Sequence, residues 1–302
     1  MTPYKTPEDR FENLKEYPFE PHFHSWQGLD QHFLDEGGRD GPVMLLLHGM
    51  PTWSYLYRRM IPPLTLAGYR CIAPDHIGFG NSDKILDDNW YSIEKHCNAL
   101  TSLIEDEDLT RITLVCQDWG GPIGLRQVTD MPERFERLIV MNTWLHSDFH
   151  EYSEGIRNWN AAWHPGGRFY DTNPCGELMK NYVSNFEGST LTPEEALRAY
   201  DAPFPTMESR AGPRRFPLSI PFDNPEGGNA AQQERCFAAM DTWQMPKHFI
   251  WGCSDNVFTE AWGEKWSSRY PGATLDKIPE AGHFLQETHA REIVDIMLRR
   301  IG

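Results

Sequence analysis

The sequence predicts an α/β protein with a mostly parallel sheet, and three observations support this fold class. Short apolar runs bounded by Gly, Pro, Asp or Asn recur along the chain, and helical stretches separate them. These runs are continuous rather than strictly alternating, which is typical of strands buried on both faces of a sheet. The length of 302 residues is enough for one large core that carries a smaller module.

Each expected element follows from its local pattern. The first is an antiparallel edge hairpin, because Phe23–Gln27 and Gln31–Glu36 are short alternating segments. We then expect strands at Pro42–His48, Tyr69–Asp75, Arg111–Asp118, Arg137–Asn142, Lys247–Asp255 and Ala273–Pro279. Helical periodicity marks Ser92–Asp106, Gly121–Asp130, Ala230–Trp243 and Phe284–Arg300.

The alternation of strand and helix stops after Asn142, and no strand-like run occurs before about Ser219. We expect an inserted helical module here. One of its helices has a clear start, because Thr192 can cap it, Pro193 suits its first turn and Glu195 completes a capping box. The predicted organisation is a main domain of residues 1–144 and 220–302, with eight strands, and a helical cap domain of residues 145–219.

Charge and composition exclude several classes of partner. Lys and Arg number 28 and Asp and Glu 44, so the formal net charge is −16, which would repel nucleic acids and anionic lipids. The longest aliphatic runs are far shorter than the ~18 residues of a membrane span, and the first residues have no apolar leader segment. The six cysteines lack metal-finger spacing, which favours reduced thiols and a cytoplasmic location.

Three residues in a characteristic order are candidates for catalysis. Asp118 ends an apolar strand in Cys-Gln-Asp-Trp-Gly-Gly, where small residues two positions away on each side permit a sharp strand-to-helix turn. At a helix N-terminus this carboxylate stays ionised. Asp255 closes a later strand, and His283 lies in the loop before the last helix. Nucleophile, acid, histidine is the chain order of α/β-hydrolases.

A loop after an early strand is the candidate for stabilising negative charge on an intermediate. Leu47-His48-Gly49-Met50-Pro51 stands where this fold needs a backbone N–H directed at a developing oxyanion. We expect the N–H groups of Met50 and Trp119 to form that oxyanion hole.

Four motifs of the chain are characteristic of one known family: His48 to Arg58 (HGMPTWSYLYR), Asp75 to Asp83 (DHIGFGNSD), Gln117 to Gly121 (QDWGG) and Gly282-His283-Phe284. Through these motifs the chain, from about Arg10 to the last helix, resembles a haloalkane dehalogenase of the α/β-hydrolase superfamily. Asn142 stands where one branch of that family has its acid, so Asp255 is the better acid here. This resembles the branch whose second halide donor is a tryptophan of the cap.

The resemblance implies a two-step hydrolysis without cofactor or metal. Asp118 would displace the halide from the substrate carbon and form an ester, which water activated by His283 would then hydrolyse while Asp255 orients the histidine. Trp119 would donate its indole N–H to the halide. The second donor is expected to be Trp159, with Trp163 as the alternative. The implied partners are a haloalkane, water and halide, and the expected state is a monomer or small homo-oligomer.

Several alternatives stay open at this point. An epoxide hydrolase uses the same nucleophile but needs paired cap tyrosines, for which Tyr152, Tyr170, Tyr182 and Tyr200 are available; Gln117 argues against it, because these enzymes usually have His there. A β-lactone-acting relative and a non-catalytic binding protein on the same scaffold are further possibilities.

Two further features of the sequence stand apart from these alternatives. Met50 occupies a position at which members of the family commonly have a polar residue. His146 and His150 form a weak candidate for a metal cluster.

Overall fold

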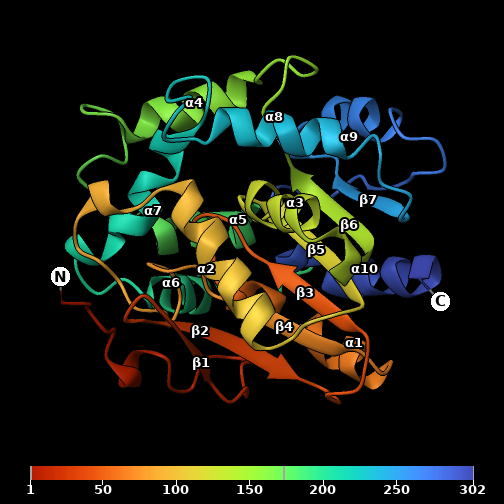
Figure 1. The fold of residues 1–302 in the computed structure, drawn as a ribbon. Coiled ribbons are helices and arrows are strands. Elements are labelled where there is room, and N and C mark those ends of the chain that lie inside the picture. Colours follow the sequence, from red (N-terminus) through yellow and green to blue (C-terminus); the bar gives the residue numbers. More distant parts are fainter. Residues whose placement is uncertain (1, 173, 302) are drawn as a thin grey trace.

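An eight-stranded sheet forms the centre of the computed structural model, which describes residues 2–172 and 174–301. The strand order is β1-β2-β4-β3-β5-β6-β7-β8, and Figure 1 labels β1 to β7 along this order. Strand β2 runs antiparallel to both of its neighbours, and every other pair is parallel. The predicted α/β class and edge hairpin are therefore confirmed. The strands are β1 His22–Trp26, β2 Leu29–Glu36, β3 Val43–Leu47, β4 Arg70–Pro74, β5 Ile112–Asp118, β6 Phe135–Thr143, β7 Lys247–Gly252 and β8 Thr274–Ile278.

Both faces of the sheet are covered, as the continuous apolar runs predict. In β3 the side chains of Val43, Leu45 and Leu47 enter one hydrophobic core, and those of Met44 and Leu46 enter the other. Side chains of α2, α3, α8 and α9 contribute to the first core, and those of α1 and α10 to the second. These helices are α1 Ile61–Leu66, α2 Ile93–Asp106, α3 Gly120–Asp130, α8 Ala230–Ala239, α9 Glu260–Ser267 and α10 Leu285–Ile301.

Between β6 and β7 the described residues form helices and loops but no strand, in agreement with the expected helical insertion. The capping box of α6 is present, since Thr192 Oγ1 accepts from the Glu195 N–H at 3.2 Å and Glu195 Oε2 from the Thr192 N–H at 2.7 Å. Helix α8 ends at Ala239, earlier than expected, because Asp241 and Thr242 form tight turns. The other helices here are α4 Glu154–Trp163, α5 Cys175–Asn185, α6 Pro193–Asp201 and α7 Ala211–Arg215.

The N-terminal segment is fastened to the end of α6. Thr6 donates its hydroxyl to the Pro203 carbonyl at 2.9 Å, and the Arg10 guanidinium donates to the carbonyls of Ala202 and Asp201 at 3.1 and 2.9 Å. These three carbonyls lie at and just beyond the last residue of the helix, where backbone oxygens can accept from other segments. No helix in the described part of the chain is long and apolar enough to cross a membrane.

Candidate active site

The three predicted catalytic residues meet at the carboxyl edge of the sheet. Asp118 ends β5, Asp255 lies in the loop after β7, and His283 lies between β8 and α10. His283 Nδ1 is 2.8 Å from Asp255 Oδ2, and its Nε2 is 3.5 Å from Asp118 Oδ2. The imidazole therefore lies between two carboxylates, with one ring nitrogen facing each of them.

A strained turn presents Asp118. Its φ of +51° lies in the left-handed region, which is uncommon for a residue with a side chain and typical of the nucleophile elbow. The turn needs the glycines that follow it, because a Cβ on Gly120 would collide with the Leu47 carbonyl and one on Gly121 with the Thr143 hydroxyl. The small residues noted in the sequence thus allow β5 and α3 to approach β3 and β6 closely.

The loop after β3 reaches the same carboxylate. The Met50 N–H donates to Asp118 Oδ1 at 2.7 Å, and a Cβ on Gly49 would overlap that side chain. His48 holds the loop, since its Nδ1 bonds the Gly49 carbonyl at 2.8 Å and its Nε2 accepts from the His76 N–H at 3.1 Å. Trp119 is the N-cap of α3, where an N–H has no acceptor within the helix.

The Asp255 carboxylate is fixed by two further donors. Its Oδ2, which faces His283, accepts from Asn142 Nδ2 at 2.9 Å, and its Oδ1 accepts from the Val257 N–H at 2.7 Å. Asn142 is itself held because its Oδ1 accepts from the Gly252 N–H at 2.8 Å. The oxygen that orients the imidazole therefore has little freedom to turn away.

The two carboxylates control the charge of His283. Burial alone would lower the pKa of the imidazole, but Asp255 and Asp118 outweigh it and raise the pKa to about 10. With both carboxylates ionised, His283 holds a proton at neutral pH. Loss of the charge on Asp118 would remove one of these influences and favour the neutral base.

Comparisons with known proteins identify the family of the chain. The sequence model of the alpha/beta hydrolase fold matches residues 42–290. A haloalkane dehalogenase of Psychrobacter cryohalolentis is 37% identical over 98% of this chain and 97% of its own. Haloalkane dehalogenase 1 of Mycobacterium tuberculosis is 38% identical over 99% of this chain and 98% of its own. The structure of haloalkane dehalogenase DpaA from Paraglaciecola agarilytica NO2 matches with a TM-score of 0.89 and 38% identity. The match covers 99% of this chain and 98% of the DpaA chain.

The chain belongs to the haloalkane dehalogenase family. The resemblance stated from its motifs is thereby confirmed, and so are the α/β-hydrolase fold and the class of hydrolase.

The predicted halide donors of a haloalkane dehalogenase lie on two parts of this fold. Trp119 is buried, and its ring lies 4.6 Å from that of Trp144 and 4.9 Å from that of Phe216 in the insertion. Trp159 and Trp163 are one turn apart on α4, and both pack on Phe169 rather than on Trp119. Trp163 is buried, and its indole N–H has no hydrogen-bond acceptor among the described residues. Trp159 is only half-buried.

The cap tyrosines do not form the donor pair of an epoxide hydrolase in this structure. The Tyr200 hydroxyl donates to Glu287 at 2.7 Å, and that of Tyr152 bonds His146 at 2.8 Å. Tyr170 is exposed, and Tyr182 packs on Phe284. Within the described residues, no tyrosine hydroxyl is hydrogen-bonded to the triad.

The weak metal candidate is not assembled. His146 is engaged by Tyr152, and His150 stacks on Trp262 at 4.1 Å. Residues 2–172 and 174–301 contain no group of three or more His, Cys, Asp or Glu side chains that could hold a metal ion.

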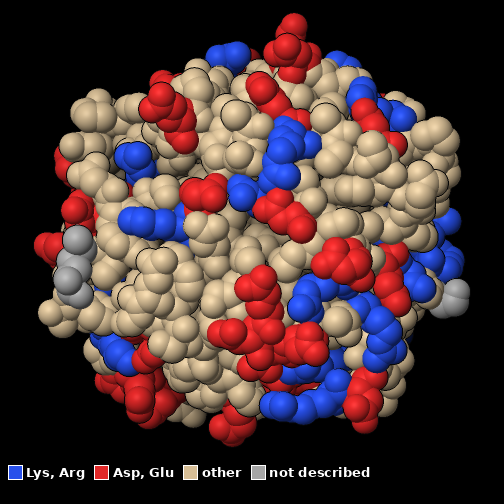
Figure 2. Space-filling view, viewed as in Figure 1, with Lys and Arg blue, Asp and Glu red and all other residues tan. Residues whose placement is uncertain are grey.

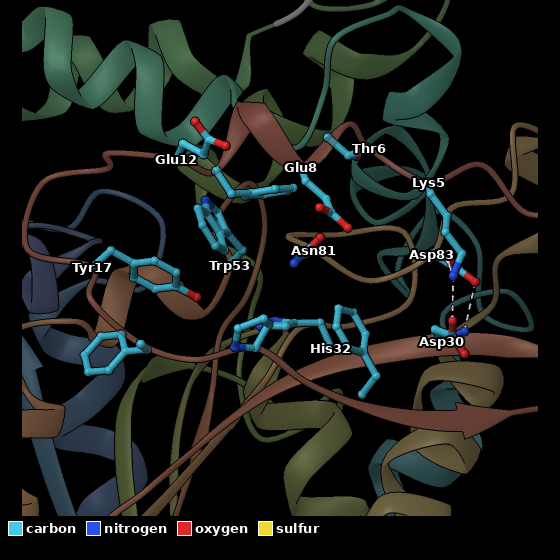
Figure 3. A pocket seen from close by; sticks show the side chains of 14 residues that line it. Lys5, Thr6, Glu8, Glu12, Tyr17, Asp30, His32, Trp53, Asn81 and Asp83 are labelled. Atoms are coloured by element: carbon cyan, nitrogen blue, oxygen red, sulfur yellow. Dashed lines mark hydrogen bonds and ion pairs between the residues drawn. The ribbon is translucent and has the colours of Figure 1, made fainter.

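A separate hollow of about 490 Å³ lies beneath the N-terminal segment, where Trp53, Tyr17 and other aromatic rings line it (Figure 3). Glu8 and Asn81 project toward its middle. Asp118, Asp255 and His283 are not part of its lining. We therefore locate the candidate active site by its reactive groups, at the edge of the sheet.

Reasoning from the sequence missed one close neighbour of His283. Gln117 Nε2 lies 3.0 Å from the main-chain oxygen of His283 and 3.2 Å from the imidazole Nε2. In the sequence, Gln117 argued only against an epoxide hydrolase. Its position at a strand end, directly before Asp118, was the signal that could have identified it.

Proposed function

We propose that the chain hydrolyses the carbon–halogen bond of haloalkanes through a covalent ester on Asp118. The observation that carries this proposal is the position of His283 between Asp118 and Asp255, with the Met50 N–H on the nucleophilic carboxylate. A carboxylate is already a strong anion at neutral pH, so it needs no base to attack.

In the first step one Asp118 oxygen forms a bond to the halogen-bearing carbon, and the halogen leaves with the bonding electrons. The Met50 N–H fixes Oδ1 and so aims the carboxylate. A leaving halide gains little from protonation and needs N–H donors in a dry site. Trp119 is the proposed first donor and Trp159 the second.

In the second step His283 removes a proton from water, and the resulting hydroxide attacks the ester carbonyl carbon of Asp118. The negative charge on the carbonyl oxygen is stabilised by the N–H groups of Met50 and Trp119, which form the proposed oxyanion hole. The acyl C–O bond then breaks, the departing alkoxide takes the proton of the newly added hydroxyl group and leaves as the alcohol, and Asp118 is restored as a carboxylate. Asp255 stabilises the imidazolium until its proton passes to solvent.

Trp163 is a second candidate for the cap donor, and a specific observation favours it. A buried indole N–H without an acceptor is costly in a folded protein, and a halide would satisfy it. Trp159 keeps priority from its place in the motif Glu154 to Trp159 (EGIRNW), which resembles the family's cap helix.

The domain division and the setting of the enzyme are also proposals. Residues 145–219 would roof the site as a cap on the main domain, since Phe216 from this segment contacts Trp119.

Acidic and basic side chains intermingle on the face drawn in Figure 2, which suits a small-molecule substrate better than a nucleic acid. Four buried thiols, Cys71, Cys97, Cys116 and Cys236, form no disulfide, which supports a cytoplasmic location. DpaA is described as tetrameric, and we propose a monomer or small homo-oligomer here.

The test is halide release from 1,2-dibromoethane by the purified enzyme. Wild type should release bromide and form alcohol continuously. Asp118→Asn should release no bromide. His283→Gln should release about one bromide per enzyme and then stop, with the alkyl ester visible as added mass on the peptide that contains Asp118. A folded wild type that releases no bromide would contradict the proposal.

A further inference from the structure

Gln117 places one side-chain nitrogen against two atoms of His283. Its Nε2 donates to the main-chain oxygen at 3.0 Å and lies 3.2 Å from the imidazole Nε2. The residue is fully buried at the end of β5, next to Asp118. No step outlined above uses this amide. The role inferred for it rests on the proposed function.

The main-chain carbonyl decides which way the amide faces. A carbonyl oxygen can only accept a hydrogen bond, so the Gln117 atom opposite it must be the nitrogen and not the oxygen. That nitrogen carries two hydrogens and no acceptor site. One hydrogen is used by the His283 carbonyl, and the other is within reach of the imidazole Nε2.

Such a donor can bond to Nε2 only when this ring nitrogen has a lone pair. The imidazole is then neutral and its proton is on Nδ1. This tautomer also donates from Nδ1 to Asp255 Oδ2, at 2.8 Å. Of the two neutral tautomers, Gln117 and Asp255 therefore favour the same one from opposite sides of the ring, and it is the one that can take a proton from water.

We propose that Gln117 is a positioning residue that keeps Nε2 of His283 unprotonated and aimed at the hydrolytic water once Asp118 has been esterified. The amide stays anchored on the main-chain oxygen. A water O–H can therefore replace the second N–H of Gln117 at Nε2 of His283, and the imidazole does not have to move.

The charges around His283 explain why this role belongs to the second step. Among the described residues two carboxylates face the ring, Asp118 from β5 and Asp255 from the loop after β7, and the rings of Phe258 and Phe284 that pack against it are uncharged. In the resting enzyme Asp118 attracts a proton to Nε2. The ester carries no charge, so Asp255 alone then favours the imidazolium, and the Gln117 N–H opposes it.

The first test measures the protonation of His283 without turnover. Asp118→Asn removes the same charge that esterification removes. We expect the pKa of His283, followed by long-range ¹H–¹⁵N NMR, to be higher by about one unit when Gln117→Met is added to Asp118→Asn, which is a tenfold change in proton affinity. His283→Gln identifies the signal. Equal pKa values in the two proteins would overturn the proposal.

The second test separates the two chemical steps by rapid quench with 1,2-dibromoethane. In Gln117→Met, the first-turnover bromide release should stay within about twofold of wild type, and alcohol formation at pH 7 should be about tenfold slower and recover at higher pH. Gln127→Met removes another buried amide, bonded to Thr101 in the neighbouring helix, and should affect neither step.

If Gln117→Met does not fold, Gln117→Asn withdraws the same amide by one methylene group and carries the same expectations. An equal loss in both steps without pH dependence would make Gln117 purely structural and overturn the proposal. Absence of bromide from wild type would count against the proposed function instead, and the NMR comparison would still decide the role of Gln117.

Discussion

Asn142 donates its side-chain N–H to Oδ2 of Asp255, the same carboxylate oxygen that lies 2.8 Å from His283 Nδ1. One oxygen of the acid therefore has an amide on one side and the imidazole on the other. Asn142 also accepts the Gly252 N–H, so it joins the end of β7 to the orientation of the base.

Removal of this amide should weaken both fold and hydrolysis. Asn142→Ala leaves the Gly252 N–H without its acceptor, which should cost about 1–3 kcal/mol of unfolding free energy in urea. Alcohol formation should slow about tenfold because Asp255 loses a donor. Asn142→Asp places a second carboxylate beside Asp255 and should be slower still. Unchanged alcohol formation in both variants would show that Asp255 is held without Asn142.

Gly49 should be essential for the attack by Asp118. In Gly49→Ala the new methyl group would occupy the space of the Asp118 carboxylate, so we expect first-turnover bromide release to fall at least a hundredfold. Gly38→Ala is the matched control, since a Cβ there meets no atom within 4 Å. The prediction fails if both alanine variants release bromide at the wild-type rate.

The charge of His283 predicts a pH-dependent stability. The pKa of His283 is about 10 in the folded enzyme, against about 6.5 in an unfolded chain. Because the folded state binds the proton more tightly, this stabilisation is complete below pH 6.5 and is lost as the pH rises to 10. The difference in unfolding free energy between wild type and His283→Gln, measured in urea, should shrink across this range. A constant difference would contradict the raised pKa.

A buried ion pair links the loop after β3 to the first turn of α10. Arg58 and Glu287 form two hydrogen bonds of 2.8 Å, and both side chains are fully buried. Glu287→Gln leaves the buried guanidinium with only the more exposed Glu16, 3.7 Å from its Nε, as a counter-charge and should cost about 3–5 kcal/mol in urea unfolding. The double variant Arg58→Met with Glu287→Leu buries no charge and should cost less. A larger loss of unfolding free energy in the double variant than in Glu287→Gln would contradict this prediction.

Halide binding should distinguish the two tryptophans of α4. Loss of an N–H donor to an anion costs about 1.5–3 kcal/mol, so Trp119→Phe and Trp159→Phe should each weaken bromide binding at least tenfold. Trp163→Phe should weaken it less. Quenching of the remaining indole fluorescence by bromide measures the affinities. A larger loss of bromide affinity in Trp163→Phe than in Trp159→Phe would assign the second donor to Trp163.

The fold and the meeting of Asp118, Asp255 and His283 could be predicted because their signals are local. Continuous apolar runs predict buried parallel strands, and Asp118, Asp255 and His283 each stand directly after or near the end of such a run. Since parallel strands end at one edge of a sheet, residues at these positions come together without further information. The capping box of α6 was equally local.

Contacts that depend on tertiary geometry could not be predicted. The bond between Gln117 and His283 depends on the path of a loop after a strand three places away in the sheet. The insertion has no strand to fix its position, so the sequence could name Trp159 and Trp163 but not the direction of their rings. The end of α8 was missed because two turns, rather than a Gly or Pro, terminate it.

The strand order has a consequence for how activity appears during folding. More than half of the chain lies between Asp118 and His283, and the strands that present them are separated by β6 and β7. A partly formed sheet, or a fragment that lacks β8, cannot bring the base to the nucleophile. Recovered bromide release is therefore a late marker in refolding, one that reports the docking of the C-terminal strand and helix rather than the first gain of secondary structure.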